Sequence, residues 1–287
     1  MLSARIRLFR HESQGMRFEL AFASPRVSLR SYVREYVGWV NRSSVPVLRR
    51  QVPSGIVPFI LNFGATVRER KADATEWHTY SAFTAGLHDR YTLVESAGSG
   101  QGLQVNFTAM GARLFYDRPM VEFANKTIEL SDAVGRFADL LEARLYEAAS
   151  WDQRFNILDH EIGARIERAR HAPAPIARAW RQLAMTGGNA RISELAEGAS
   201  WSERHFARQF CEHIGLTPKA FARILRFSRA VRLARTGCGG NLAAVAQVCG
   251  YYDQAHLAAD FRVFAGVTPS ALLKSQLPQN AGFRSTP

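Results

Sequence analysis

The sequence predicts an α+β protein of two domains, the first rich in strands and the second entirely helical. Three observations indicate this architecture. Short β-rich runs occupy residues 16–107, helical periodicity begins after residue 110, and one helix pattern in the last third recurs at a spacing of 51 residues. We therefore expect a strand-rich domain with its own helices over residues 1–170, a helical bundle over residues 171–276 and a flexible tail over residues 277–287.

The strand prediction depends on three runs, 36–40, 57–63 and 104–107, which are rich in β-branched and aromatic residues. Turn residues separate them, at 53–55 and in the glycine cluster 97–102. Several short strands without helix-length periodicity predict a sandwich or a small barrel.

Helices follow this region. One amphipathic helix is expected to begin at Ser131-Asp132 and a second at Trp151-Asp152. The prolines in 171–175 mark a boundary, because proline stops one helix and can start the next. A third helix is expected over residues 176–185.

The repeated pattern carries the most information. Its first copy has Ser202, Phe206, Phe210, Gly215 and Thr217-Pro218, and its second has Asp253, Leu257, Phe261, Gly266 and Thr268-Pro269. Each copy holds a capping side chain, two apolar residues one turn apart, a glycine stop and a Thr-Pro that opens the next helix. A short helix with Ala196 or Ala246 precedes each copy, and the chain must turn at Ser200 or Gly250. Two helix-turn-helix units are therefore predicted.

Between the two units, residues 218–235 predict a connecting helix roughly 27 Å long at 1.5 Å per residue. Successive major-groove faces on one side of DNA lie about 34 Å apart. The connecting helix is thus of the right order of length to place two helices in neighbouring grooves.

Charge agrees with this interpretation. The chain has 37 Lys and Arg against 25 Asp and Glu, a formal net charge of +12. Residues 178–274 hold 13 of the basic residues and only 6 of the acidic ones. A basic excess over the repeated units favours double-stranded DNA as the partner.

The segment GYYDQAHLAADFRVFAGVTPSALL closely resembles the second motif of AraC/XylS-family transcriptional regulators, and ILRFSRAVRLAR resembles the family's long connecting helix. The N-terminal segments ILNFG and GLHDRYTLVESAG are similar to the strand-rich region of an AraC-like subgroup. This resemblance implies a sequence-specific DNA-binding domain and a cupin-like N-terminal domain that senses a small-molecule effector or forms a homodimer. It also implies RNA polymerase as a partner.

One departure from the family lies in the first turn, where the family has glycine and this chain has Ser200. A positive φ angle costs serine about 1 kcal/mol. Another lies at Ala259, where the family often has a long polar or basic side chain.

In the first recognition helix, Phe206 and Phe210 face the core. The opposite face and the cap give the expected DNA contacts Ser202, Glu203, Arg204, Ala207 and Arg208. Arginine can bond both acceptors of guanine, and Arg204 and Arg208 occupy positions that read bases in the family. The alternatives are phosphate contact or a solvated surface.

The second recognition helix has fewer side chains that can read bases. Its expected contacts are Asp253, Gln254, Ala255, His256, Ala258, Ala259 and Arg262. Gln254 can pair with adenine, and alanine methyls can touch thymine. Its larger expected contribution is positioning on the DNA backbone through main-chain amides and Arg262. His256, like His205, has two interpretations, a phosphate contact or a structural histidine.

In the N-terminal domain, the expected effector-binding residues are Trp39, Phe63, Phe83, His88, Arg90 and Tyr91. The alternative is that these aromatic residues fill the core, which is the commoner role of aromatics on strands. Strand register decides between the two, and the sequence does not fix it.

A rival hypothesis is a metal-dependent β-barrel enzyme fused to a helical interaction module. The eight histidines are scattered, and no GxSxG, P-loop or HExxH pattern occurs in its proper context. We therefore expect no catalytic residues, no metal and no cofactor. Another rival is a helical module that binds protein rather than DNA.

Three cysteines without a CxxC pair favour a reducing compartment. No apolar run reaches about 18 residues, and the charged N-terminus differs from a secretion signal. We expect a cytoplasmic protein that contacts no membrane. The helices over residues 131–168 could pair with those of a second subunit or cover the sheet of their own chain.

Overall fold

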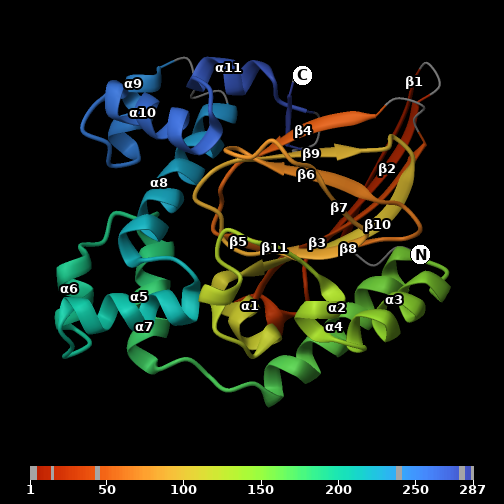
Figure 1. Ribbon diagram of the computed structural model, residues 1–287, viewed down its shortest axis with the longest axis horizontal. Coiled ribbons are helices and arrows are strands. Elements are labelled where there is room, and N and C mark those ends of the chain that lie inside the picture. The colour runs from red at the N-terminus through yellow and green to blue at the C-terminus, as the bar shows by residue number, and fades with distance from the viewer. Residues whose placement is uncertain (1–4, 14–15, 43–45, 237–240, 278–281, 286–287) are drawn as a thin grey trace.

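The computed structural model describes residues 5–13, 16–42, 46–236, 241–277 and 282–285. It confirms the α+β class. Two antiparallel sheets stack in the N-terminal half, helices cover one of them, and a separate group of helices follows (Figure 1). The sheets form an open sandwich, and the strands begin ten residues earlier than predicted, at Ile6.

The larger sheet has seven strands. In spatial order these are β1 (Ile6–Ser13), β2 (Met16–Ala23), β3 (Val33–Arg42), β10 (Gly100–Thr108), β5 (Ile56–Asn62), β8 (Ala82–Ala85) and β11 (Thr127–Glu129). The smaller sheet has β12 (Phe283–Arg284), β4 (Val47–Gln51), β9 (Thr92–Ser96), β6 (Val67–Lys71) and β7 (His78–Tyr80).

Helices cover the face of the larger sheet that points away from the smaller one (Figure 1). They are α1 (Ala109–Tyr116), α2 (Leu130–Val134), α3 (Phe137–Glu147) and α4 (Trp151–Arg168), with short 3-10 turns η1 (Val27–Leu29) and η2 (Met120–Glu122). The Tyr36 hydroxyl donates to Asp159 of α4 over 2.8 Å, and the Trp151 indole donates to Glu19 over 2.7 Å. These two bonds fix α4 on the sheet. Buried residues of the helix and of the sheet pack together in the hydrophobic core.

The helix predicted to begin at Ser131 is in fact two helices. Gly135, at φ 59°, ends α2, and α3 begins at Phe137. Two apolar residues of α3, Leu140 and Tyr146, are 62 % and 63 % exposed. The second helix begins at Trp151 as predicted, with Ser150 as its cap.

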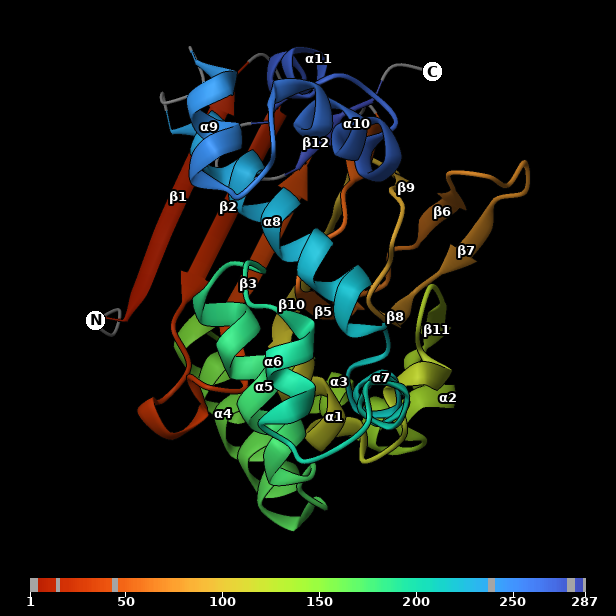
Figure 2. The same cartoon turned by 90° about the vertical axis from the view of Figure 1, so that its left-hand side faces the viewer.

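The C-terminal helices are α5 (Ala174–Met185), α6 (Ile192–Glu197), α7 (Glu203–Ile214), α8 (Pro218–Arg235), α9 (Leu242–Val248), α10 (Gln254–Ala265) and α11 (Pro269–Lys274). Helix α8 has the predicted bounds of the connecting helix. It runs between α5–α7 at one end and α9–α11 at the other (Figure 2). Each unit has its own aromatic core, around Phe210 and Phe221 in the first and around Phe227 and Phe261 in the second.

The tail prediction was wrong where the structure describes the tail. Phe283 and Arg284 pair with Arg50 and Arg49 of β4, which places β12 at the edge of the smaller sheet. Phe283 is only 2 % exposed and packs under the guanidinium of Arg235 at 5.2 Å. The local sequence of the tail does not encode this pairing. It depends on the edge of β4, whose free backbone N–H and C=O groups pair with the tail residues. Residues 278–281 and 286–287 lie outside the described residues.

Within the described ranges, no helix is long and apolar enough to cross a membrane. Cys211 and Cys249 are free thiols, and Cys238 lies outside these ranges. The same ranges contain no group of three or more His, Cys, Asp or Glu side chains placed to hold a metal ion.

Candidate nucleic-acid interface

The two predicted turns have the same hydrogen-bonding pattern. The Ala196 carbonyl accepts from the Trp201 amide over 3.2 Å, and the Ala246 carbonyl accepts from the Tyr251 amide over 2.9 Å. Both alanines are 1 % exposed where the two helices of each unit cross. Gly250 has a φ angle of 77°, and Ser200 has one of 57°. Ser200 thus adopts the same left-handed conformation as Gly250, at the place where the chain was expected to turn.

Both recognition helices, α7 and α10, begin at the predicted caps. The Ser202 hydroxyl accepts from the His205 amide over 3.3 Å, and the Asp253 carboxylate accepts from the His256 amide over 2.7 Å. Both end at glycines in the left-handed conformation, Gly215 in α7 and Gly266 in α10. Local cap chemistry therefore sets the length of each recognition helix.

Helix α7 presents a charged face. Phe206 and Phe210 are fully buried. The exposed residues are Ser202, Glu203, Arg204 and Arg208, and Ala207 between them is half-buried. His205 lies between the Trp201 ring, at 4.8 Å, and the Arg208 guanidinium, at 3.2 Å. Of Arg204 and Arg208, Arg204 is therefore the one whose guanidinium is not held by His205.

Helix α10 presents a smaller and less charged face. Leu257 and Phe261 are fully buried. The exposed residues are Asp253, Gln254, Ala255, His256, Ala259 and Arg262, and Ala258 is half-buried. The edge of the Tyr251 ring meets the His256 ring at 5.2 Å, which matches the Trp201–His205 contact of the first unit.

One buried acid fixes α10 to the connecting helix. Asp260 is 2 % exposed and accepts from Arg223 of α8 over 2.6 Å. The Tyr251 hydroxyl is buried nearby, and burial together with the Asp260 charge raises the pKa of this phenol. A buried carboxylate requires such a partner, so α8 and α10 are held as one body.

Sequence reasoning missed Tyr252. Its side chain is 93 % exposed, directly before the cap of α10. A spacing signal could have identified it. Ser200 and Gly250 are 50 residues apart, whereas Ser202 and Asp253 are 51 apart, so the second turn contains one extra residue. The extra residue is Tyr252, which lies directly before the exposed N-terminal end of α10.

Comparisons with known proteins agree with this geometry. A family model described as "Helix-turn-helix domain" matches residues 195–275, and one for a domain of unknown function matches residues 22–129. The chain carries an AraC-type helix-turn-helix domain. An uncharacterized HTH-type transcriptional regulator of Haemophilus influenzae is 34 % identical over 84 residues, which are 29 % of this chain. The match spans 28 % of that relative's length.

Two solved structures are similar along most of the chain. ToxT of Vibrio cholerae has a TM-score of 0.46 at 10 % identity, over 91 % of this chain and 98 % of that one. The AraC-like transcriptional activator CuxR has a TM-score of 0.36 at 13 % identity, over 85 % of this chain and 90 % of that one.

The AraC-type domain contacts the N-terminal domain at the C-terminal end of each recognition helix. A Cβ atom on Gly215 would lie 2.9 Å from the carbonyl oxygen of Met120 in η2. Close by, Arg113 of α1 donates to His213 over 3.3 Å. At the other end of the AraC-type domain, a Cβ atom on Gly266 would lie 3.0 Å from the guanidinium of Arg50. The N-terminal ends of α7 and α10 stay exposed.

The expected effector-binding residues do not converge on one site. Trp39 faces the smaller sheet, whereas Phe63 lies on the opposite face of the larger sheet, against Tyr146 of α3 at 6.0 Å. Phe83 packs on Tyr80 at 5.5 Å, and Tyr91 lies under Arg50 beside the AraC-type domain. Arg90 is exposed, and His88 lies near Glu69, with its pKa lowered mainly by burial.

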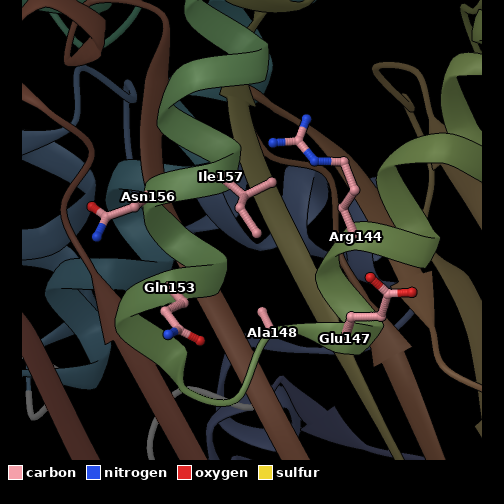
Figure 3. A pocket seen from close by; sticks show the side chains of 6 residues that line it. All are labelled: Arg144, Glu147, Ala148, Gln153, Asn156 and Ile157. Carbon is pink, nitrogen blue, oxygen red and sulfur yellow. The ribbon is translucent and has the colours of Figure 1, made fainter.

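An open hollow lies where α3 turns into α4. It is lined by Arg144, Glu147, Ala148, Gln153, Asn156 and Ile157. Figure 3 shows these side chains spread apart, with Asn156 directed away from Arg144 and Glu147. Arg144 already pairs with Glu161. The hollow therefore lacks converging polar groups that would define a binding site.

Proposed function

We propose that this protein is a sequence-specific DNA-binding transcription regulator whose N-terminal domain responds to a small-molecule effector. The observation that carries the proposal is the arrangement of α7 and α10. Each recognition helix leaves its capped N-terminal end exposed and docks its C-terminal glycine on the N-terminal domain. An exposed helix start with free amides and cations is the arrangement that reads a major groove.

In this proposal α7 supplies most of the base contacts. Arg204 and Arg208 are exposed cations that can bond guanine, and Ser202, Glu203 and Ala207 flank them. Helix α10 makes fewer base contacts, through Gln254 and the alanine methyls of residues 255, 258 and 259. Its other contacts come from the main-chain amides at the start that Asp253 caps, and from His256, Arg262 and the exposed Tyr252, and they position the helix on the phosphate backbone.

The effector acts through the two docking contacts. Because each recognition helix is held at its C-terminal end by a different part of the N-terminal domain, a shift within that domain changes the distance between the helices. A coupling free energy of about 1–3 kcal/mol changes DNA occupancy several-fold to a hundredfold.

We propose further that the chain works in the cytoplasm, uses no catalytic site and contacts RNA polymerase at the promoter. The N-terminal domain extends over residues 1–170 and the AraC-type domain over residues 171–276. Leu140 and Tyr146 are exposed apolar side chains of α3, which supports homodimerisation through this helix.

The test is a selection of bound sequences from random duplex DNA with the full chain. We expect a bipartite site whose two elements are about 10–10.5 base pairs apart, with higher information in the element read by α7. Affinity should fall steeply with salt, because bound counterions are released. Recovery of unselected sequences, together with weak binding, would show a helical module that recognises protein instead.

A further inference from the structure

The first recognition helix holds one of its two arginines in place. The Arg208 guanidinium donates to the Nδ1 atom of His205 over 3.2 Å, from three residues further along α7. A guanidinium has N–H donors and no acceptor, so the ring nitrogen must be the acceptor. The His205 ring is therefore neutral in this contact and carries its proton on Nε2.

The His205 ring is itself held from the other side. The Trp201 ring, in the turn before α7, meets it edge to face, with ring centroids 4.8 Å apart and an interplanar angle of 89°. Trp201 is half-buried, and its amide donates to the Ala196 carbonyl over 3.2 Å. Arg208 is exposed. A chain of contacts therefore connects the buried part of the turn, through His205, to an exposed cation.

The second unit contains the same aromatic–histidine pair without the cation. The Tyr251 ring meets the His256 ring at 5.2 Å, also with an interplanar angle of 89°. The repeat of 51 residues aligns His256 with His205. It aligns Ala259 with Arg208, so a methyl group without a donor stands where the first unit has its guanidinium. The two recognition helices lie at opposite ends of α8 (Figure 2). They differ in whether the histidine has an arginine to hold.

The hydrogen bond to His205 leaves Arg208 able to pair with a base. It uses one of the five N–H groups of the guanidinium, and a bidentate pair with guanine needs two. A side chain that is ordered before DNA binds loses less conformational entropy on binding. A guanidinium fixed in one direction also reaches fewer base edges than a free one. The contact therefore favours a single guanine over its alternatives.

We propose that His205 is a positioning residue, which holds Arg208 in the direction in which it pairs with guanine. In the second unit His256 is placed to hold an arginine in the same way, but residue 259 provides none. This inference rests on the proposed DNA-binding function, and it assigns a specificity role to a side chain that contacts Arg208 rather than DNA.

The first experiment compares two substitutions of the same shape. Leucine and asparagine are both branched at Cγ, but only asparagine has an acceptor one bond beyond it, as histidine has at Nδ1. His205→Leu should reduce the preference for guanine at one base pair of the selected site by about 2- to 10-fold, as expected when one side chain must be ordered on binding. His205→Asn should keep most of that preference.

Competition binding of the full chain against every single-base variant of the selected site measures these preferences. A uniform loss across all variants in His205→Leu would overturn the proposal, because a structural role weakens every sequence alike. An unchanged or stronger guanine preference in His205→Leu, or the same loss in His205→Asn, would also overturn it.

A double-mutant cycle shows whether the effect passes through Arg208. In the Arg208→Ala background the guanine preference is already lost, so His205→Leu should change no base preference further. A further change there would show that His205 contacts a base itself. If His205→Leu fails to fold, as judged by circular dichroism, His205→Ala takes its place. Alanine is a strong helix former and keeps the residue 205 amide that donates to Ser202.

The second unit allows a test by gain of preference. Ala259→Arg places an arginine three residues after His256, so a guanine preference of about fivefold or more should appear in the element that α10 contacts. Adding His256→Leu to this variant should reduce the new preference by about 2- to 10-fold. His256→Leu alone is the control and should change no base preference. If Ala259→Arg creates no preference, or keeps all of it without His256, the proposal fails for the second unit.

The wild-type chain separates this inference from the proposed function. If it selects no sequence from random duplex DNA, the DNA-binding proposal itself fails. If it selects a site and His205→Leu keeps every base preference, only the positioning role of His205 fails.

Discussion

The guanidinium of Arg50 donates a hydrogen bond of 2.7 Å to the carbonyl oxygen of Ala265, the last residue of recognition helix α10. The same guanidinium stacks on the Tyr91 ring at 4.2 Å. A cation at a helix C-terminus satisfies a carbonyl that has no partner within the helix and complements the helix dipole. One strand of the N-terminal sheet thereby holds the end of a DNA-reading helix.

Replacing Arg50 should loosen this end of the AraC-type domain. Arg50→Met removes a hydrogen bond from a charged donor, so we expect a loss of about 1.5–3 kcal/mol of local stability. Amide hydrogen exchange of the last turn of α10 and of strand β12 should accelerate. Arg68→Met, which removes a partly exposed ion pair with Glu95 and a stacking contact with Trp77, is the control and should leave these amides unchanged. Similar exchange in the two variants would show that Arg50 does not couple the domains.

The turn of the first unit is strained. Ser200 has a φ angle of 57°, a conformation that glycine adopts freely. Ser200→Gly should therefore stabilise the protein by about 0.5–1 kcal/mol, which raises Tm by about 1–4 °C in a chain of this size. The reverse change is the matched control. Gly250→Ser places a side chain at φ 77° and against Asn189, and thermal unfolding should show a lower Tm. A lower Tm for Ser200→Gly would mean that the serine side chain is needed.

The contact between α1 and α7 should depend on pH. His213 is 8 % exposed and accepts a hydrogen bond from Arg113 at its Nδ1 atom, which requires a neutral ring. Burial, and then the Arg113 charge, lower the pKa of His213 below the value of about 6.5 for an unfolded chain. Below pH 6.5 the unfolded chain therefore binds more protons, and the stability from this contact is lost as the pH falls.

Denaturant unfolding at pH 7 and pH 5 measures this effect. His213→Asn should weaken the pH dependence relative to wild type, because its side chain does not titrate. His160→Asn is the control, since the His160 side chain is 75 % exposed. If the two variants keep equal pH dependence, protonation of His213 does not govern the contact.

The sequence predicted the features that short-range chemistry determines. Ser202 and Asp253 cap the recognition helices, Gly215 and Gly266 end them, and the connecting helix has its predicted bounds. These positions depend on side chains within one turn of the helix end. The charge excess over the same region follows from composition alone.

The features that the sequence did not predict depend on contacts between segments that are far apart along the chain. Trp39 and Phe63 both looked like aromatic lining, but register places them on opposite faces of one sheet. The pairing of Phe283 with Arg50 joins the C-terminal segment to a strand of the N-terminal domain, and no local pattern encodes it. The burial of the Arg49 Nε atom likewise depends on which face of β4 meets the larger sheet.

Base reading by α7 can be tested at one residue. Arg204 is exposed at the start of the helix, whereas the Arg208 guanidinium contacts His205. Arg204→Ala should cost about 1–3 kcal/mol at one base pair of the selected site and relax the preference there. Arg191→Ala is the matched control, because it removes the same charge from the same unit at a residue that pairs with Glu194 outside α7. Competition binding against every single-base variant of the site separates the two roles of Arg204. A uniform loss across all variants would show that it contacts phosphate, because a phosphate contact carries no base preference.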